Sequence, residues 1–200
     1  MTVSRSTPRL RLTVLLLVAT LGTVAVSDRT LLDGATGALV QLAGLAVISC
    51  AALGRVWTST FIAGFKDASI VREGPYSALR HPLYALSLAA MLGVGLASRS
   101  AAITIALVAV FAIVFRRAAR EEDRFLADAH REAFETFRRE VPAFWPVLRA
   151  YRVPDTIEVR PRIFWKAFLD AGSLLGYYVL LRVADLAQLY GVTPTWMELP

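Results

Sequence analysis

Three side chains with complementary chemistry stand close together between two apolar stretches. Residues 74–84 read Gly-Pro-Tyr-Ser-Ala-Leu-Arg-His-Pro-Leu-Tyr and carry a guanidinium, an imidazole and a phenol at Arg80, His81 and Tyr84. Arginine binds carboxylates and phosphates, and histidine can exchange a proton near neutral pH. Pro82 suits the first turn of a helix, so His81 is the expected cap, beside the free N–H groups of that turn. The segment predicts a ligand site; the alternative is an interfacial anchor that holds these side chains at headgroup level.

Two neighbouring carboxylates form a second candidate site. Glu121 and Glu122 follow directly after a long apolar run. Four arginines stand near them in the sequence: Arg116, Arg117, Arg120 and Arg124. A carboxylate in this place can hold the ammonium group of a ligand. The alternative is a charged helix end with ion pairs between residues four apart, such as Arg117 and Glu121.

Two glycines lie in the apolar run between these polar groups. Gly93 and Gly95 flank a single valine. Glycines in a membrane helix favour close packing against neighbouring helices. The alternative is that the missing side chains leave room for a flat ligand. If the apolar run folds back on itself as two paired helices, the polar segment 74–84 and the glutamate pair lie at the same end of these helices, where they could meet.

The composition indicates the kind of protein that positions these residues. The 200-residue chain is 56% hydrophobic and 19% charged, with a mean hydropathy of +0.53. Soluble domains are roughly 45–50% apolar and about 25% charged. The single cysteine, Cys50, has no partner in the chain, which excludes a disulfide scaffold. The chain is therefore expected to be an integral membrane protein.

Apolar runs define the expected membrane spans. They are Leu10 to Ser27, Gly37 to about Trp57, Leu83 to Phe115 and Ile163 to about Leu189. A span needs about 20 apolar residues, and a straight helix over the third run would reach ~50 Å, longer than a bilayer core. That run is therefore predicted to be a helical hairpin at 82–119, turning at Ser98–Ser100. The fold class predicted is all-α, polytopic, with about five spans.

A further helix is expected on the cytoplasmic surface. Within the charged segment from Arg116 to Pro161, apolar residues recur at roughly helical spacing: Phe125, Ala129, Phe134, Phe137 and Val141. The pattern predicts an amphipathic surface helix that stops before Pro142. The organisation expected is two N-terminal spans over 1–57, a core over 58–150, and a linker with a last span over 151–200.

The basic residues predict the orientation. Of the 22 Lys and Arg residues, nineteen fall on one side if the N-terminus is cytoplasmic, and three fall on the other. The positive-inside rule therefore places the N-terminus and the candidate site in the cytoplasm. Because the arginines fall between the apolar runs instead of forming one continuous stripe, and because they match no nucleic-acid motif, no nucleic acid is expected as a partner. The two histidines lie about fifty residues apart, so no metal site is expected.

The order of the motifs resembles the membrane methyltransferase family that includes isoprenylcysteine carboxyl methyltransferases and phospholipid N-methyltransferases. The resemblance rests on residues 74–84, the Gly-Val-Gly at 93–95, Arg-Glu-Glu-Asp-Arg-Phe at 120–125 and Val-Pro-Ala-Phe-Trp-Pro at 141–146. It covers about Arg55 to Pro146. Two departures are Ala85, where members often carry glycine, and residues 129–137, which lack the commoner Phe-Gly-x-x-Tyr-x-x-Tyr element on the presumed substrate side.

The resemblance implies S-adenosylmethionine as cofactor, bound at the cytoplasmic ends of the hairpin helices. It assigns cofactor binding to Tyr76, Arg80, His81, Tyr84, Gly93, Gly95, Glu121 and Glu122. The expected reaction is methyl transfer to a lipid-like or apolar acceptor, through either a carboxylate or a phospholipid amine. The alternatives are a membrane reductase of related architecture that uses NADPH, and a non-enzymatic membrane scaffold.

Basic and aromatic residues at the same expected depth predict where the acceptor enters. Arg55 and Trp57 end the second span, and Arg117 follows the fourth. A basic entrance favours an amphiphile with a carboxylate or phosphate beside its methylated atom. These three residues are therefore the candidates for substrate binding.

Overall fold

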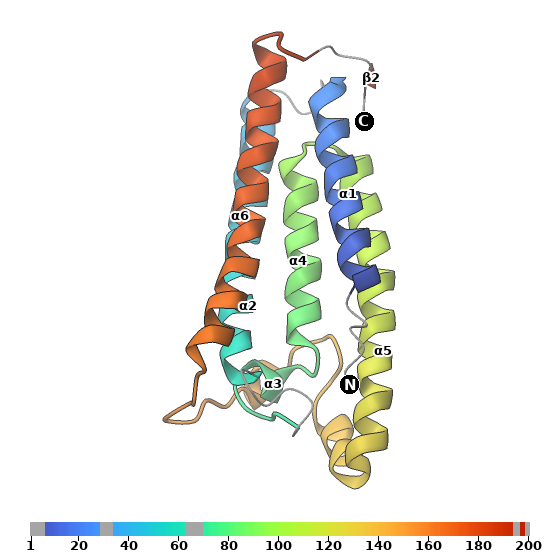
Figure 1. Cartoon of the computed structure of the whole chain (residues 1–200), viewed down its shortest axis with the longest axis vertical. Coiled ribbons are helices and arrows are strands. Elements are labelled where there is room, and N and C mark those ends of the chain that lie inside the picture. Colours follow the sequence, from blue (N-terminus) through green and yellow to red (C-terminus); the bar gives the residue numbers. More distant parts are fainter. Residues whose placement is uncertain (1–6, 29–33, 63–69, 194–196, 199–200) are drawn as a thin grey trace. The chain divides into compact units, whose positions relative to one another are not determined.

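The computed structural model describes residues 7–28, 34–62, 70–193 and 197–198, which are almost entirely helical (Figure 1). The described residues form five helices of 16 residues or more: α1 (Thr7–Val26), α2 (Gly34–Ile62), α4 (Pro82–Ala97), α5 (Ala101–Glu140) and α6 (Pro161–Leu189). Short elements are α3 (Pro75–Ala78), the 3-10 helix η2 (Leu148–Ala150), and β1 (Ser27–Asp28), which pairs in parallel with β2 (Met197–Glu198). The predicted all-α class is confirmed.

Three of the long helices are apolar and long enough to cross a membrane. They are α2, α5 and α6, while the described residues of α1 and α4 include shorter apolar helices over Leu12–Ala25 and Pro82–Ala97. Large apolar side chains on these helices face outward, among them Leu39, Leu53 and Ile105, which are 66%, 72% and 69% exposed. Such a surface is unfavourable in water and fits a lipid environment. The protein is thus a membrane protein.

The predicted hairpin is present, and serines shape its turn. α4 ends at Ala97 and α5 begins at Ala101 (Figure 1). The Ser98 hydroxyl donates to the carbonyl of Gly95 at 2.6 Å, and Arg99 adopts a positive φ of 58°. The Ser100 hydroxyl accepts from the N–H of Ile103, which caps the first turn of α5.

The predicted amphipathic helix is not a separate element, because it continues α5. The helix runs to Glu140, before Pro142 as expected, with a kink at Arg131, whose φ is 25° and ψ is −100°. Phe134, Phe137 and Val141 lie after the kink and form a buried cluster. For this part of the segment the predicted apolar face is confirmed.

For the residues before the kink, the predicted apolar face is wrong. Phe125 is 49% exposed and Ala129 is also exposed, whereas Leu126 and Ala127 pack against the buried cluster. The predicted pattern has a five-residue step between Ala129 and Phe134, which no continuous helix accommodates on one face. The kink changes the phase of the helix within that step.

The described contacts divide the chain into two compact units. Unit 1 comprises 1–48, 91–114 and 175–200, and unit 2 comprises 49–90 and 115–174. α2, α4, α5 and α6 each contribute residues to both units.

In unit 1, α2 and α4 approach each other through glycines. A Cβ on Gly93 would lie 2.9 Å from the carbonyl oxygen of Gly44 and 3.0 Å from the backbone nitrogen of Ile48. A Cβ on Gly95 would lie 2.6 Å from the Cα of Thr104 in α5. Backbone therefore occupies the space beside both glycines, as in the close-packing alternative.

The ionisable residues of α6 in unit 1 are paired. The Asp185 carboxylate lies 2.5 Å from a terminal nitrogen of Arg182 and 3.9 Å from one of Arg99, and it accepts a hydrogen bond from Gln41 at 3.2 Å. Arg182 also donates to the carbonyl of Ala97. Charged groups within an apolar helix are costly unless they pair in this way, so the cluster makes α6 compatible with a membrane span.

The close approach of α2 and α4 yields a stability prediction. Gly93→Ala should destabilise the protein by about 1–3 kcal/mol, because the new Cβ would press on backbone that a rotamer change cannot move. Gly172→Ala in α6 is the matched control, since a Cβ there meets nothing within 4 Å. Both changes replace a glycine in a helix by alanine and so gain the same helix propensity. The difference between their melting temperatures in detergent therefore measures the cost of the close contact at residue 93. Equal melting temperatures for the two variants would contradict the observed contact.

Candidate functional site

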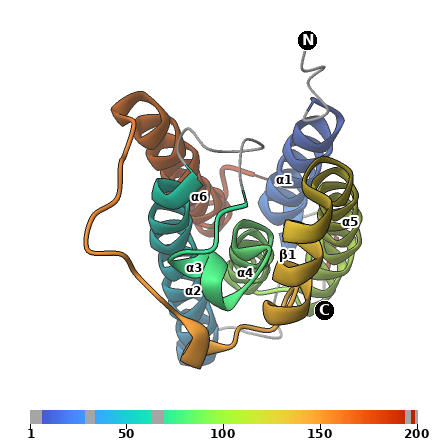
Figure 2. The same cartoon turned by 90° about the horizontal axis from the view of Figure 1, so that it is seen from below.

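The polar segment of residues 74–81 begins with a glycine that no other residue could replace without strain. Gly74 has a φ of 57°, and a Cβ on it would lie 2.5 Å from ring atoms of Phe61 at the end of α2. Its N–H donates to the carbonyl of Arg152 at 2.6 Å. Pro75 then starts α3, which lies beside the end of α2 and the start of α4 (Figure 2). Sterics thus fix where the segment starts.

A second strip of chain, residues 142–152, holds the segment through backbone hydrogen bonds. The N–H of Arg80 donates to the carbonyl of Pro142 at 2.9 Å, and the N–H of Val147 donates to Ala78 at 3.0 Å. The Ser77 hydroxyl accepts from the N–H of Arg152 at 2.9 Å. The closing motif that follows α5 is therefore the support on which Arg80 and its neighbours rest.

His81 caps α4, as the sequence predicts. Its carbonyl accepts the N–H of Ala85, and α4 begins at Pro82. The ring is 4% exposed and lies between aromatic groups, 5.8 Å from the centroids of both Tyr84 and Phe144. Backbone position and ring packing together leave the imidazole little freedom.

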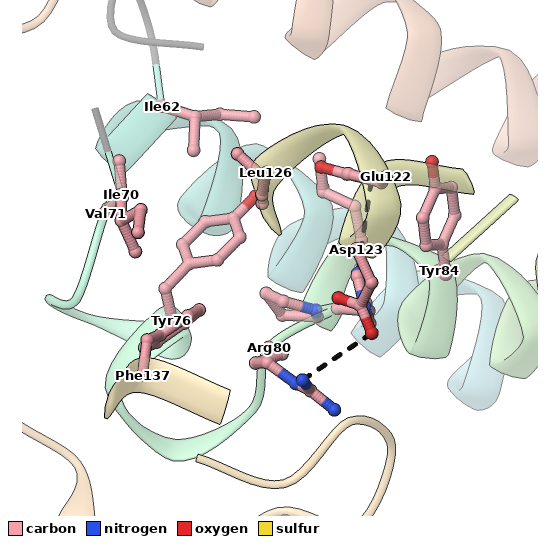
Figure 3. Close-up of a pocket in the computed structure, with 13 residues that line it drawn as sticks. Ile62, Ile70, Val71, Tyr76, Arg80, Tyr84, Glu122, Asp123, Leu126 and Phe137 are labelled. Carbon is pink, nitrogen blue, oxygen red and sulfur yellow. Dashed lines mark hydrogen bonds and ion pairs between the residues drawn. The ribbon is translucent and has the colours of Figure 1, made fainter. Parts of the chain in front are cut away.

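Asp123 of α5 joins the two basic residues of the segment. Its Oδ1 lies 2.9 Å from Nε2 of His81, and its Oδ2 lies 3.5 Å from a terminal nitrogen of Arg80 (Figure 3). Because a carboxylate only accepts hydrogen bonds, Nε2 of His81 carries the proton of that bond. The other ring nitrogen, Nδ1, lies 4.0 Å from Oε2 of Glu122. The expected meeting of the two hairpin ends is therefore present in unit 2.

Sequence reasoning missed Asp123, although a usable signal was present. Ala118 and Ala119 are buried, and one turn later Glu122 and Asp123 occupy the same face of α5. Glu121 is exposed and does not line the pocket described below. A helical projection of Ala119 through Leu126 would have selected Asp123 in place of Glu121.

These residues surround a pocket in unit 2. Its lining consists of Ile62, Ile70, Val71, Tyr76, Arg80, His81, Pro82, Leu83, Tyr84, Glu122, Asp123, Leu126 and Phe137 (Figure 3). Five residues predicted from the sequence are among them: Tyr76, Arg80, His81, Tyr84 and Glu122. The pocket volume is about 120 Å³. The lining combines polar and charged side chains with aliphatic side chains and the ring of Phe137.

Burial changes the chemistry of two side chains of the pocket, the Tyr76 phenol and the Arg80 guanidinium. Burial raises the pKa of the Tyr76 phenol well above its usual value, and the nearby Glu122 charge raises it further, so the phenol stays protonated and can donate a hydrogen bond. Arg80 has a side chain only 10% exposed. Its Nε is buried and finds no hydrogen-bond acceptor in the part of the chain that the structure describes. A buried donor in this state is a position where an anionic ligand group can bind.

The remaining predicted residues are not part of the lining of this pocket. Gly93 and Gly95 belong to unit 1 and pack against backbone. Arg117 is exposed on α5. None of the three lines the pocket. Their predicted roles in binding stay predictions.

Arg55 and Trp57 have other partners in unit 2. Arg55 hydrogen-bonds to Ser87 of α4 and forms an ion pair with Asp170 of α6. Trp57 donates its indole N–H to the hydroxyl of Tyr151 at 2.8 Å. Both side chains therefore connect elements of unit 2, and their predicted contact with an acceptor stays a prediction.

Comparison with known proteins identifies relatives. Residues 34–133 match the family model for phospholipid methyltransferases. The chain is 38% identical over 154 residues to the cobalt-zinc-cadmium resistance protein CzcN of Cupriavidus metallidurans, covering 77% of this chain and 71% of that protein. It is 31% identical over 157 residues to the nickel-cobalt-cadmium resistance protein NccN of Alcaligenes xylosoxydans xylosoxydans, covering 78% and 73%. No solved structure matches.

The family match covers half of the chain, including the complete hairpin turn and all the polar residues that line the pocket. The chain belongs to the phospholipid methyltransferase family.

Proposed function

We propose that the pocket binds S-adenosylmethionine and that the protein transfers the cofactor's methyl group to a lipid-like acceptor in the membrane. The observation that carries the proposal is the convergence of Arg80 and Glu122 on one pocket. The amino-acid end of the cofactor has a carboxylate and an ammonium group, which need a cation and an anion respectively. Family membership supports the same cofactor.

The residues present fit the cofactor at this end. The buried, unpartnered Nε of Arg80 suits the carboxylate, and the Glu122 carboxylate, 32% exposed, suits the ammonium group. Ile70, Leu126 and Phe137 offer apolar contacts. The volume of about 120 Å³ is below the ~300–1,000 Å³ of sites that enclose a whole small molecule, so these residues would enclose only part of the cofactor.

The reaction proposed makes modest demands on the protein. The cofactor, when bound, supplies a methyl group already activated by a sulfonium. The protein must hold the acceptor in line with that group and exclude water. A carboxylate acceptor needs no base. An amine acceptor must lose a proton, and Nδ1 of His81 can take it, since Asp123 already holds the proton on Nε2.

The acceptor proposed is an amphiphile that carries a carboxylate or a phosphate near the methylated atom. The apolar outward surface of the helices supports an acceptor that arrives from the lipid.

The relatives named for metal resistance suggest a setting for such a reaction. Methylation of a carboxylate removes an anionic oxygen ligand, and this would reduce the affinity of the membrane surface for divalent cations.

The reductase and scaffold alternatives are separated by ligand binding. Detergent-purified protein should bind labelled S-adenosylmethionine saturably and release it on addition of S-adenosylhomocysteine. Incubation with extracted lipids should then yield a product that mass spectrometry identifies as the acceptor with one added methyl group in place of a proton. Binding of NADPH alone would favour a reductase, and binding of neither cofactor would favour a scaffold.

The position of the two glutamates on α5 gives a sharper prediction. Glu122→Gln should weaken S-adenosylmethionine binding by about 1.5–3 kcal/mol, the range for a hydrogen bond to a charged group. Glu121→Gln is the matched control, because it removes the same charge from the exposed neighbour outside the pocket. The dissociation constants can be measured by isothermal titration calorimetry. Equal effects of both changes would argue against the assigned role of Glu122.

The proposal also requires the pocket to face the cytoplasm, where the cofactor is made. The charge bias of the sequence supports this orientation. An alkaline phosphatase fused after Arg139 should be inactive because it stays in the cytoplasm, and one fused after Arg99 should be active outside. An active fusion after Arg139 would place the pocket on the wrong side and refute the cofactor assignment.

A further inference from the structure

A second hollow in unit 2 shares Asp123 with the cofactor pocket. Its volume is about 300 Å³, and its lining consists of Arg120, Asp123, Arg124, Ala127, Phe134 and Arg138. Three arginines thus border one space. No part of the proposed methyl transfer uses this space.

The positive charge of the hollow is not neutralised by its own lining. Asp123 is the single carboxylate there, and it is occupied by His81 and Arg80. Arg120 and Arg124 stand one helical turn apart, a spacing at which like charges destabilise a helix. A terminal nitrogen of Arg138 lies 3.6 Å from a carboxylate oxygen of Glu135. The two side chains are 59% and 50% exposed, so this surface ion pair is weak. An anion in the hollow would relieve the repulsion.

The kink in α5 creates the hollow. Arg120 and Arg124 precede Arg131, whereas Phe134 and Arg138 follow it. In a straight helix, Arg124 and Arg138 would be about 21 Å apart along the axis, because they are separated by fourteen residue steps. The backbone of Arg131, with a φ of 25°, folds the chain so that both sets border one space. A positive φ is strained for arginine, and such strain is concentrated at functional positions.

The walls of the hollow suit a compact anion with several oxygens. Arginine is the side chain that binds phosphate through paired N–H groups, and it does so better than lysine. Phe134 is 1% exposed, so its ring is held in place by its surroundings, and the small side chain of Ala127 also borders the hollow. The combination is a rigid, cationic, open site.

We propose that Arg120, Arg124 and Arg138 form a binding site for a phosphate group, separate from the cofactor pocket. The phosphate belongs either to a lipid headgroup or to a soluble phosphate compound. The site bridges the two segments of α5, so a bound phosphate stabilises the bend and with it the part of α5 that carries Asp123. This proposal stands independently of the proposed methyl transfer.

Direct binding to the full-length protein in neutral detergent tests the proposal. Inorganic phosphate and short-chain phosphatidic acid below its micellar concentration are titrated calorimetrically at constant ionic strength. The combined change Arg120→Gln, Arg124→Gln and Arg138→Gln should raise the dissociation constant of each bound probe at least tenfold. The control combination Arg116→Gln, Arg139→Gln and Arg149→Gln removes the same charge from exposed positions outside the hollow and should change it less than threefold.

The two probes distinguish the source of the phosphate. Tighter binding of phosphatidic acid indicates a lipid headgroup, and equal binding indicates a soluble phosphate compound. Binding of neither probe, or an equal loss in the control, would overturn the proposal. If the triple variant fails to fold, Arg120→Gln and Arg138→Gln are tested singly, each with an expected weakening of threefold or more. S-adenosylmethionine binding is measured separately, so failure of one proposal leaves the other distinguishable.

Discussion

The carboxylate of Asp123 is the contact on which the candidate site depends. It accepts from the ring of His81, which caps α4, and it lies beside Arg80 at the end of the preceding loop. One side chain of α5 therefore fixes both the imidazole and the guanidinium. The same register of α5 turns Glu122 toward the pocket and Glu121 toward the outside. The carboxylates that line the pocket and the ring nitrogen of His81 that carries the proton both depend on this register of α5, and so does the shape of the pocket.

Backbone contacts provide the rigidity that this arrangement needs. Gly74 admits the ring of Phe61 at a distance that no Cβ allows, and residues 142–152 hold the loop through main-chain hydrogen bonds. Unit 1 uses the same means, with Gly44 and Gly93 bringing two helices into contact. Its partly buried charges are paired around Asp185, which lowers the cost of placing them in an apolar helix. In both units, small residues set the distances and ion pairs connect the helices.

The sequence was sufficient to predict the apolar helices, the turn at Ser98–Ser100 and the cap at His81, because apolar runs and proline positions depend on local physics. Five residues of the pocket were also predictable from their motif. Asp123 could have been predicted from a helical projection that places it one turn after Ala119, whereas the outward position of Phe125 could not, because it depends on the phase of α5 and on the kink at Arg131. The partners of Arg55 lie 32 and 115 residues away, and spacing along the chain carries no information about such contacts.

We propose that the pocket beside Asp123 holds S-adenosylmethionine. Ultraviolet cross-linking of radiolabelled S-adenosylmethionine to the purified protein, followed by peptide mapping, tests it most directly. We expect the label on peptides containing residues 70–84 or 122–137, and we expect S-adenosylhomocysteine to prevent labelling. Label confined to α1 or to the C-terminal half of α6, or labelling that S-adenosylhomocysteine does not reduce, would contradict it.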